Sequence, residues 1–333
     1  MTFGFRYVKV INNRKLYAQR GCLEHVSGLI LSFCRGKMLL FIMRYEGEIY
    51  RPPSEANSLI LQVTIGCSHN RCSFCNAYLK KNFRERELDE IFADVDYVGK
   101  INRNIKRIFL ADGNALTMDK KKLLALLEKL YNTFPGLERV SSYANPHDLL
   151  HKSVQDLKEI KEAGLTLVYL GVETGNHDLL QEINKGVSRS EMIEAGQKAR
   201  GAGMKLSVTV INGLGGKELI ETHARDTATL LNQVEPEYLG LLTLMVEPGT
   251  SIARQVEQGE FVPLDSREVL EEIELMLKDI DLKGCIFRSN HASNYLPLRG
   301  TLSEDKNKLL EMIDRVLRGG ETQRLRPEIF RGL

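Results

Sequence analysis

The feature that most constrains the fold is a regular alternation of strand-like and helix-like segments between residues 59 and 245. Short runs rich in β-branched and aromatic residues alternate with longer segments of amphipathic, helical periodicity. The six expected strands cover residues 59–65, 107–111, 138–143, 165–172, 205–211 and 238–245. Strands that are separated by helices form βα units, whose strands pair in parallel. The sequence therefore predicts an α/β fold built on a parallel sheet.

Polar residues and glycines gather just beyond the carboxyl end of each expected strand. These positions hold Cys67, Asp112, Asn145, Glu173, Asn212 and Glu247. In a barrel of βα units the carboxyl ends of the strands form one rim, and active sites are built on that rim. Some of the pattern is turn chemistry, as at Pro146 and Gly249. We nevertheless expect a functional site at this rim.

Three of the six cysteines fall close together, directly after the first expected strand. Cys67, Cys72 and Cys75 would leave one thiol unpaired in any disulfide arrangement, so a metal site is favoured. A structural zinc ion needs four ligands, and His69 would have to be the fourth. An iron–sulfur cube held by three cysteines would instead keep one iron open for another ligand. The residues alone leave both alternatives open.

The composition is that of an ordinary globular protein, with 43% hydrophobic and 27% charged residues. Arg35 and Lys37 interrupt the apolar run between Gly28 and Met43, so no membrane span is expected. The sequence shows no signal-peptide pattern, and cysteines without partners suit a reducing compartment. We therefore expect a cytoplasmic protein.

The cysteine loop resembles the cluster loop of the radical S-adenosylmethionine (radical SAM) enzymes, with Phe74 directly before the third cysteine. The usual family spacing has three and then two intervening residues. This chain has the variant Cys-x4-Cys-x2-Cys, a longer first gap that occurs in branches of the family. Residues 112–114 resemble the family's Gly-Gly-Glu-type turn, and 169–175 its Gly-Val-Glu-Ser segment. Residues 204–216 and 248–250 resemble the Elongator-3, methylthiotransferase and anaerobic coproporphyrinogen oxidase side of the family.

This resemblance implies a particular fold and domain organisation. The core would be a partial (βα)6 barrel, similar to a TIM barrel, over residues 57–255, with a lead-in at 43–56. Residues 256–333 would form a C-terminal extension that caps the barrel. Residues 1–42 are an N-terminal extension with seven basic residues and one acidic residue, Glu24. Because relatives begin near Met43, we assign no function to that extension.

The resemblance also implies cofactors and their ligands. Cys67, Cys72 and Cys75 would hold a [4Fe–4S] cluster, with S-adenosylmethionine (SAM) on its open iron. Reductive cleavage of SAM would yield a 5′-deoxyadenosyl radical that acts on a small polar substrate. The residues implied in SAM binding are Phe74, Asp112, Gly113, Asn114, Tyr143, Asn145 and Glu173. Glu173 could instead be an acid favoured at a helix N-terminus, and Asn145 with Pro146 could be only a turn.

The resemblance further implies an electron-donor protein such as flavodoxin or ferredoxin as partner, and neither a membrane nor nucleic acid is expected. Residues 285–295 form a β-like run of unusually polar character, in which Arg288 and His291 are candidates for substrate contact. The alternative for this run is a polar loop with capping Asn and Ser residues. The histidines at 147, 151, 177 and 223 are expected at the surface or at helix starts.

Alternative functions also stay open. The chain could be a coproporphyrinogen-oxidase-like or RNA-modifying member of the same family, although no accessory domain is visible that would favour RNA. It could also be a zinc-stabilised binding protein without catalytic activity, which would use the same cysteines.

Overall fold

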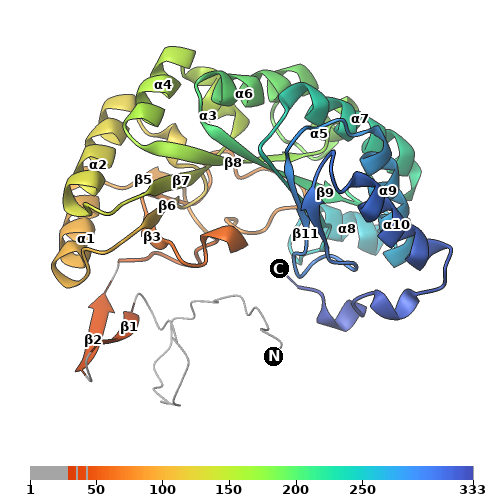
Figure 1. Cartoon of the computed structure of the whole chain (residues 1–333), viewed down its shortest axis with the longest axis horizontal. Helices are drawn as coiled ribbons and strands as arrows, with labels where there is room; N and C mark the ends of the chain where they lie inside the picture. The colour runs from red at the N-terminus through yellow and green to blue at the C-terminus, as the bar shows by residue number, and fades with distance from the viewer. Residues whose placement is uncertain (1–28, 35–36, 43, 333) are drawn as a thin grey trace. The chain divides into compact units, whose positions relative to one another are not determined.

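The computed structural model describes residues 29–34, 37–42 and 44–332 of the chain (Figure 1). Residues 1–28 of the expected N-terminal extension, and Met43 at the start of the expected lead-in, lie outside the described residues. The chain divides into two compact units. The first comprises Met1–Ser68 and Ala77–Ser142, and the second comprises His69–Asn76 and Tyr143–Leu333. We describe each unit by itself.

The first unit is built on parallel strands in the order β3-β6-β7. Their bounds are β3 (Leu59–Gln62), β6 (Arg107–Ala111) and β7 (Arg139–Ala144). Helices α1 (Leu88–Ile101) and α2 (Lys120–Thr133) pack against each other beside these strands (Figure 1). Two small antiparallel sheets pair β1 (Leu29–Cys34) with β2 (Lys37–Ile42) and β4 (Thr64–Ile65) with β5 (Arg84–Glu85). Short 3-10 helices are η1 (Pro53–Glu55) and η2 (Ala115–Thr117).

The second unit has strands in the order β8-β9-β10-β11-β12. The first four strands are parallel and the last is antiparallel. Their bounds are β8 (Leu165–Glu173), β9 (Lys205–Asn212), β10 (Tyr238–Thr243), β11 (Ile286–Ser289) and β12 (Leu298–Thr301). The helices are α3 (Pro146–His151), α4 (Val154–Glu162), α5 (His177–Glu182), α6 (Arg189–Gly201), α7 (Ile220–Val234), α8 (Ser251–Gln258), α9 (Ser266–Asp279) and α10 (Lys306–Leu317). Short 3-10 helices are η3 (Lys217–Leu219), η4 (Thr322–Arg324) and η5 (Glu328–Phe330).

The sheet of the second unit has two unlike faces. Helices α4, α6 and α9 pack against β8 and β9 on one side of the strands (Figure 1). Along β9 the side chains of Leu206, Val208 and Val210 are buried, whereas Ser207 and Thr209 are partly exposed. Successive side chains of a strand point to opposite faces. The buried set therefore faces the helices, and we call the side that carries Ser207 and Thr209 the open face.

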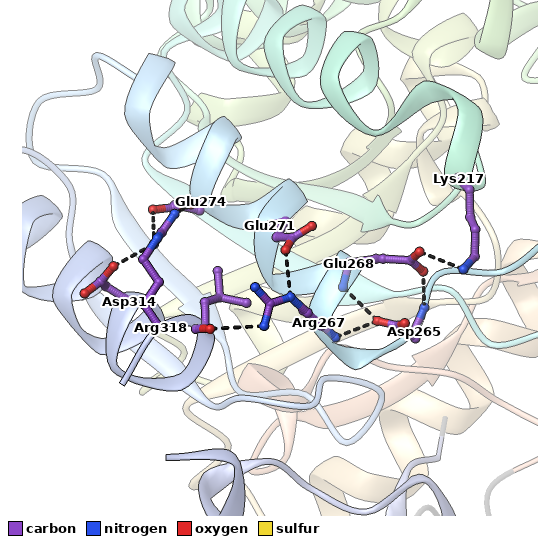
Figure 2. Close-up of polar contacts among 9 residues, drawn as sticks. Lys217, Asp265, Arg267, Glu268, Glu271, Glu274, Asp314 and Arg318 are labelled. Carbon is purple, nitrogen blue, oxygen red and sulfur yellow. Dashed lines mark hydrogen bonds and ion pairs between the residues drawn. The ribbon is translucent and has the colours of Figure 1, made fainter. Parts of the chain in front are cut away.

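Helix α9 is joined to its neighbours by ion pairs (Figure 2). Asp265 caps the helix by accepting hydrogen bonds from the backbone N–H groups of Arg267 and Glu268. Glu268 pairs with Lys217 at 2.7 Å, at the start of the segment that leads into α7. Arg318, which follows α10, donates to Glu274 of α9 at 3.1 Å. Pairs at a solvated surface contribute about 0–1 kcal/mol each, so they orient α9 more than they stabilise it.

The structure confirms the expected α/β class with a mostly parallel sheet, and the strands of the described residues form no closed barrel. The strand expected at 59–65 is divided at Val63, where the chain changes partner from β6 to β5. The strand expected at 238–245 ends at Thr243, where its pairing with β9 ends opposite Asn212. Helix α8 and strand β12 were not expected. Among the described residues, no helix is both long and apolar enough to cross a membrane.

His223 was expected at the surface or at a helix start; it lies in the first turn of α7, but the surface alternative is wrong. Its side chain is fully buried within α7, and Nδ1 lies 2.8 Å from Glu272 Oε1 on α9. Glu272 also accepts the N–H of Gly213, which follows β9. Because helices α7 and α9 pack face to face, a polar residue at their contact becomes buried.

Candidate cofactor site

Cys72 and Cys75 lie in a loop whose backbone is held by the second unit. The N–H of Ser73 donates to Ile183 O at 2.9 Å, just after α5. The carbonyl of Ser73 accepts the N–H of Ile252 at 3.2 Å, in the first turn of α8. These two bonds hold the backbone between the two cysteines. None of Cys67, Cys72 and Cys75 is in a disulfide with another described residue, and all three are partly exposed, which is compatible with binding a cluster.

Asn184 holds the preceding part of the same loop. Its backbone is left-handed (φ 55°), and its side-chain Nδ2 donates to Arg71 O at 3.2 Å. Its carbonyl oxygen lies 2.7 Å from Nε2 of His69. The zinc alternative required His69 as fourth ligand, and this contact occupies one of its two ring nitrogens. In the part of the chain that the structure describes, no three His, Cys, Asp or Glu side chains are arranged to hold a single metal ion.

Cys67 lies in the first unit, directly against the turn formed by residues 112–114. The N–H of Gly113 donates to Gly66 O at 3.0 Å. A Cβ atom at Gly113 would lie only 2.6 Å from Cys67 Cα, so glycine is required for this close approach. Asn114 accepts the Ser68 N–H at 3.1 Å and donates to Ser68 Oγ at 2.8 Å. The turn thus forms the support of the first cysteine.

Asp112 is fully buried behind this turn. Its Oδ2 accepts hydrogen bonds from Lys81 Nζ, from Gln62 Nε2 and from the Gly66 N–H. Burial raises the pKa of Asp112, and the charge of Lys81 opposes that rise. Its other oxygen, Oδ1, is buried and has no hydrogen-bond partner among the described residues. Oδ1 is therefore the part of Asp112 that a ligand could still use.

Glu173 ends β8 in a left-handed conformation (φ 64°) and forms an ion pair with Lys185 at 2.7 Å. Both side chains are nearly buried, with exposed fractions of 11% and 8%. A Cβ atom at Gly171 would lie 2.0 Å from Glu173 Oε1, so only glycine leaves room for the carboxylate. The alternative that Glu173 is a helix-start acid is wrong, because α5 begins at His177 and is capped by Asn176.

Lys185 was missed in the sequence. It lies in the loop after α5, and no motif marks it. The sequence feature that could have pointed to it is Gly171, because a glycine two residues before Glu173 at the end of a strand leaves room for a close polar contact.

The other candidates for SAM binding lie in different surroundings. Phe74 packs against the buried cluster Leu179, Ile183, Leu214 and Ile252. The ring of Tyr143 meets that of Tyr169 edge to face, with centroids 6.1 Å apart. Asn145 forms the capping box of α3, its N–H donating to Asp148 Oδ2 at 2.9 Å. Asn145 therefore has the structural role of a helix cap.

Arg288 and His291 have different environments. Arg288 is exposed on β11, and its Nη1 donates to Phe287 O at 2.7 Å and to Gly300 O at 3.4 Å. His291 lies in the loop that follows, with Nδ1 2.9 Å from Ser293 Oγ. Burial, with a smaller contribution from the charge of Arg326, lowers the pKa of His291 to about 4. No described contact joins the two residues, so their shared role as substrate contacts stays a prediction.

The sequence was compared with protein families and with curated proteins. Residues 61–231 match the family model of the Radical SAM superfamily. The chain is similar to the heme chaperone HemW of Bacillus subtilis (strain 168), 23% identical over 226 residues, which are 66% of this chain and 58% of that protein. It is also similar to the tRNA-2-methylthio-N(6)-dimethylallyladenosine synthase of Methylacidiphilum infernorum (isolate V4), 28% identical over 227 residues, 63% of this chain and 46% of that protein. The chain thus spans about half the length of the curated relatives it matches.

A solved structure supports the fold. Coproporphyrinogen III oxidase (HemN) from Escherichia coli superimposes with a TM-score of 0.51 at 16% identity, covering 66% of this chain and 51% of that one. At this identity the likeness concerns the fold alone. The family match, in contrast, extends over just over half of the chain and includes all three clustered cysteines, the 112–114 turn and Glu173 with Lys185. The chain therefore belongs to the radical SAM superfamily, whose members use a [4Fe–4S] cluster and S-adenosylmethionine.

Proposed function

We propose that this protein is a radical SAM enzyme that cleaves SAM reductively and acts on a small polar substrate. When bound, the cluster supplies the electron that breaks a C–S bond of the SAM sulfonium, which releases methionine and a 5′-deoxyadenosyl radical. The observation that carries the proposal is the anchored backbone of the cysteine loop. Ser73 is hydrogen-bonded on both sides between Cys72 and Cys75, so the loop is held in place by the protein.

The three cysteines would each bind one iron and leave the fourth for SAM. Gly113 and Asn114 would support Cys67 through Gly66 and Ser68, without contacting SAM through the Asn114 amide. That amide already makes two hydrogen bonds to Ser68. This division of roles assigns Asn114 to positioning rather than to the binding of the methionyl amino group.

Glu173 and Lys185 would bind polar groups of SAM. They place a carboxylate and an ammonium 2.7 Å apart at the end of β8. SAM carries both an ammonium and a carboxylate on its methionyl part, and hydroxyls on its ribose, so either residue offers it a charge-assisted hydrogen bond. Phe74, packed on an apolar cluster, would cover the cofactor from the loop side.

The electron must come from a reductant, for which a flavodoxin or ferredoxin in the cytoplasm is the proposed partner. The names of the two relatives described above refer to heme and to tRNA. Because heme and tRNA differ in chemistry, these names do not narrow the proposed substrate further.

The test is anaerobic reconstitution with iron and sulfide, followed by reduction with dithionite in the presence of SAM. We expect about four irons per chain and the formation of 5′-deoxyadenosine, measured by chromatography. A folded protein that takes up one zinc ion and no iron would overturn the proposal and restore the zinc alternative. A protein that binds the cluster but never cleaves SAM would limit the proposal to cofactor binding.

A further inference from the structure

One row of residues crosses the open face of the second unit and ends in two arginines. Strand register aligns Gly171 with Thr209 and Thr209 with Gly240. It then aligns Gly240 with Arg288 and Arg288 with Arg299. Residues aligned in this way project from the same face of a sheet. Thr209 lies on the open face, so the two arginines lie there too.

The burial of the residues next to Arg288 and Arg299 agrees with the placement of both arginines on the open face. Phe287 and Ser289 on either side of Arg288 are fully buried, and so is Leu298 beside Arg299. Both arginines, in contrast, are exposed. The nearby acid Asp305 lies on the other face, because its carboxylate contacts the position where a Gly300 Cβ would be and accepts the Thr301 N–H.

The two arginines form an unbalanced pair of like charges. They are directly opposite in an antiparallel pair, which places their Cβ atoms about 5 Å apart. Among the residues that the structure describes, no carboxylate forms an ion pair with either guanidinium. Arg288 donates only to two backbone carbonyls. Like charges directly opposite each other destabilise a sheet, so the arrangement lacks a structural benefit in the absence of an anion.

No side chain of the described residues fills the position next to Arg288 in this row. Gly240 is the residue next to Arg288 in the row, and a Cβ atom built there would meet nothing closer than Val208 O at 3.7 Å. Thr209, one strand further, offers a hydroxyl. Gly171 ends the row beside Glu173 and Lys185. Three strand spacings separate Arg288 from Gly171, about 14 Å in all, which suits a small molecule between the arginines and SAM.

We propose that Arg288 and Arg299 together bind an oxyanion, a carboxylate or a phosphate, of the substrate, so that the substrate is an anionic small molecule. This inference rests on the proposed function, since it names the substrate class of that same site. Guanidinium groups bind carboxylate and phosphate through paired N–H donors. The bound anion also balances the repulsion between the two side chains. Arg299 is therefore a specificity-determining residue.

The experiment is isothermal titration calorimetry of the reconstituted holoenzyme at low ionic strength, with succinate in one arm and inorganic phosphate in the other. The variants are Arg299→Gln, which removes the positive charge, and Arg299→Lys, which keeps the charge but lacks the paired N–H donors of a guanidinium group. The matched control is Arg225→Gln, which removes one positive charge from the exposed side of α7, where Arg225 pairs with Glu221.

We expect the wild type to bind one of the two anions, and which one it binds identifies the oxyanion. Arg299→Gln should weaken binding at least tenfold, Arg299→Lys should weaken it less, and Arg225→Gln should match the wild type. Failure of the wild type to bind either anion overturns the inference. Equal weakening in Arg225→Gln and Arg299→Gln also overturns it, because the effect would then be one of net charge.

Thermal unfolding provides a second readout. Without anion, Arg299→Gln should unfold at a higher temperature than the wild type, because the repulsion is removed. The bound anion should raise the Tm of the wild type and leave that of the variant nearly unchanged. If Arg299→Gln does not fold, Arg288→Gln gives the same comparison. Failure of the proposed function is recognised separately, by absent iron uptake in the wild type, whereas an intact cluster without anion binding refutes only this inference.

Discussion

Lys185 Nζ lies 2.7 Å from Glu173 Oε1, and the Cβ-free Gly171 makes room for that carboxylate. The two charges come from the end of β8 and from the loop after α5, at a position where both side chains are nearly buried. A charge pair of this kind strongly destabilises a protein when one partner is removed, because the other charge is then left buried and unpaired.

The first prediction concerns this pair. Glu173→Gln should weaken SAM binding by roughly tenfold, since a charge-assisted hydrogen bond is replaced by a neutral one. Gly171→Ala should have a similar effect, because the added methyl group displaces the carboxylate. Equilibrium binding of SAM to the reconstituted protein measures both. Unchanged SAM affinity with a lowered Tm would show that the pair is only structural.

The second prediction separates ligand cysteines from a buried one. Cys67→Ala, Cys72→Ala and Cys75→Ala should each abolish stable uptake of the cluster. Cys285→Ala should not, because Cys285 is 1% exposed and burial raises the pKa of its thiol to about 12, which disfavours the thiolate that binds iron. The iron content of each variant after anaerobic reconstitution measures cluster uptake. Full iron content in a Cys67→Ala protein, or its loss in Cys285→Ala, would contradict the assignment.

The third prediction tests the support of Cys67. Asn114→Ala removes two hydrogen bonds to Ser68 and should destabilise the protein by about 1–3 kcal/mol. It should also make the cluster easier to lose to a chelator, because the backbone beside Cys67 is no longer held. Asn104→Ala is the matched control, since Asn104 is exposed in a loop. Equal rates of iron loss in the two variants would remove Asn114 from any positioning role.

The fourth prediction concerns acid stability. The pKa of His291 is lowered from 6.5 to about 4 by burial. Between these values the unfolded chain binds a proton that the folded protein excludes. The stability that His291 contributes is therefore complete above about pH 6.5 and is lost as the pH falls toward about 4, on the order of 1–3 kcal/mol. Urea unfolding of the wild type and of His291→Gln, near neutral pH and at about pH 5, measures this. Parallel stability changes in both proteins would show that other groups dominate.

Much of the candidate site follows from local patterns. The βα alternation, the three clustered cysteines and Glu173 are visible because strand and helix periodicities, and short motif spacings, are encoded within a few neighbouring residues. The alternation predicts helix between the strands expected at 138–143 and 165–172, but it does not predict the division of that helix into α3 and α4. Asn145 and Ser153 form the capping boxes at the starts of α3 and α4. A serine such as Ser153 can be identified as a cap only when it is known that the preceding helix has ended before it.

The class of the fold, the family and the three cysteines proposed as cluster ligands could be predicted from the sequence, since these depend on residue types and their order along the chain. Tertiary structure decided which distant side chains meet. Asn114 bonds to Ser68 and Arg299 lies opposite Arg288, while His223, polar in sequence, is buried against Glu272. Such contacts depend on strand register and on helix packing. A shift of one residue in strand register would send the side chain to the other face of the sheet, and no local periodicity records that choice.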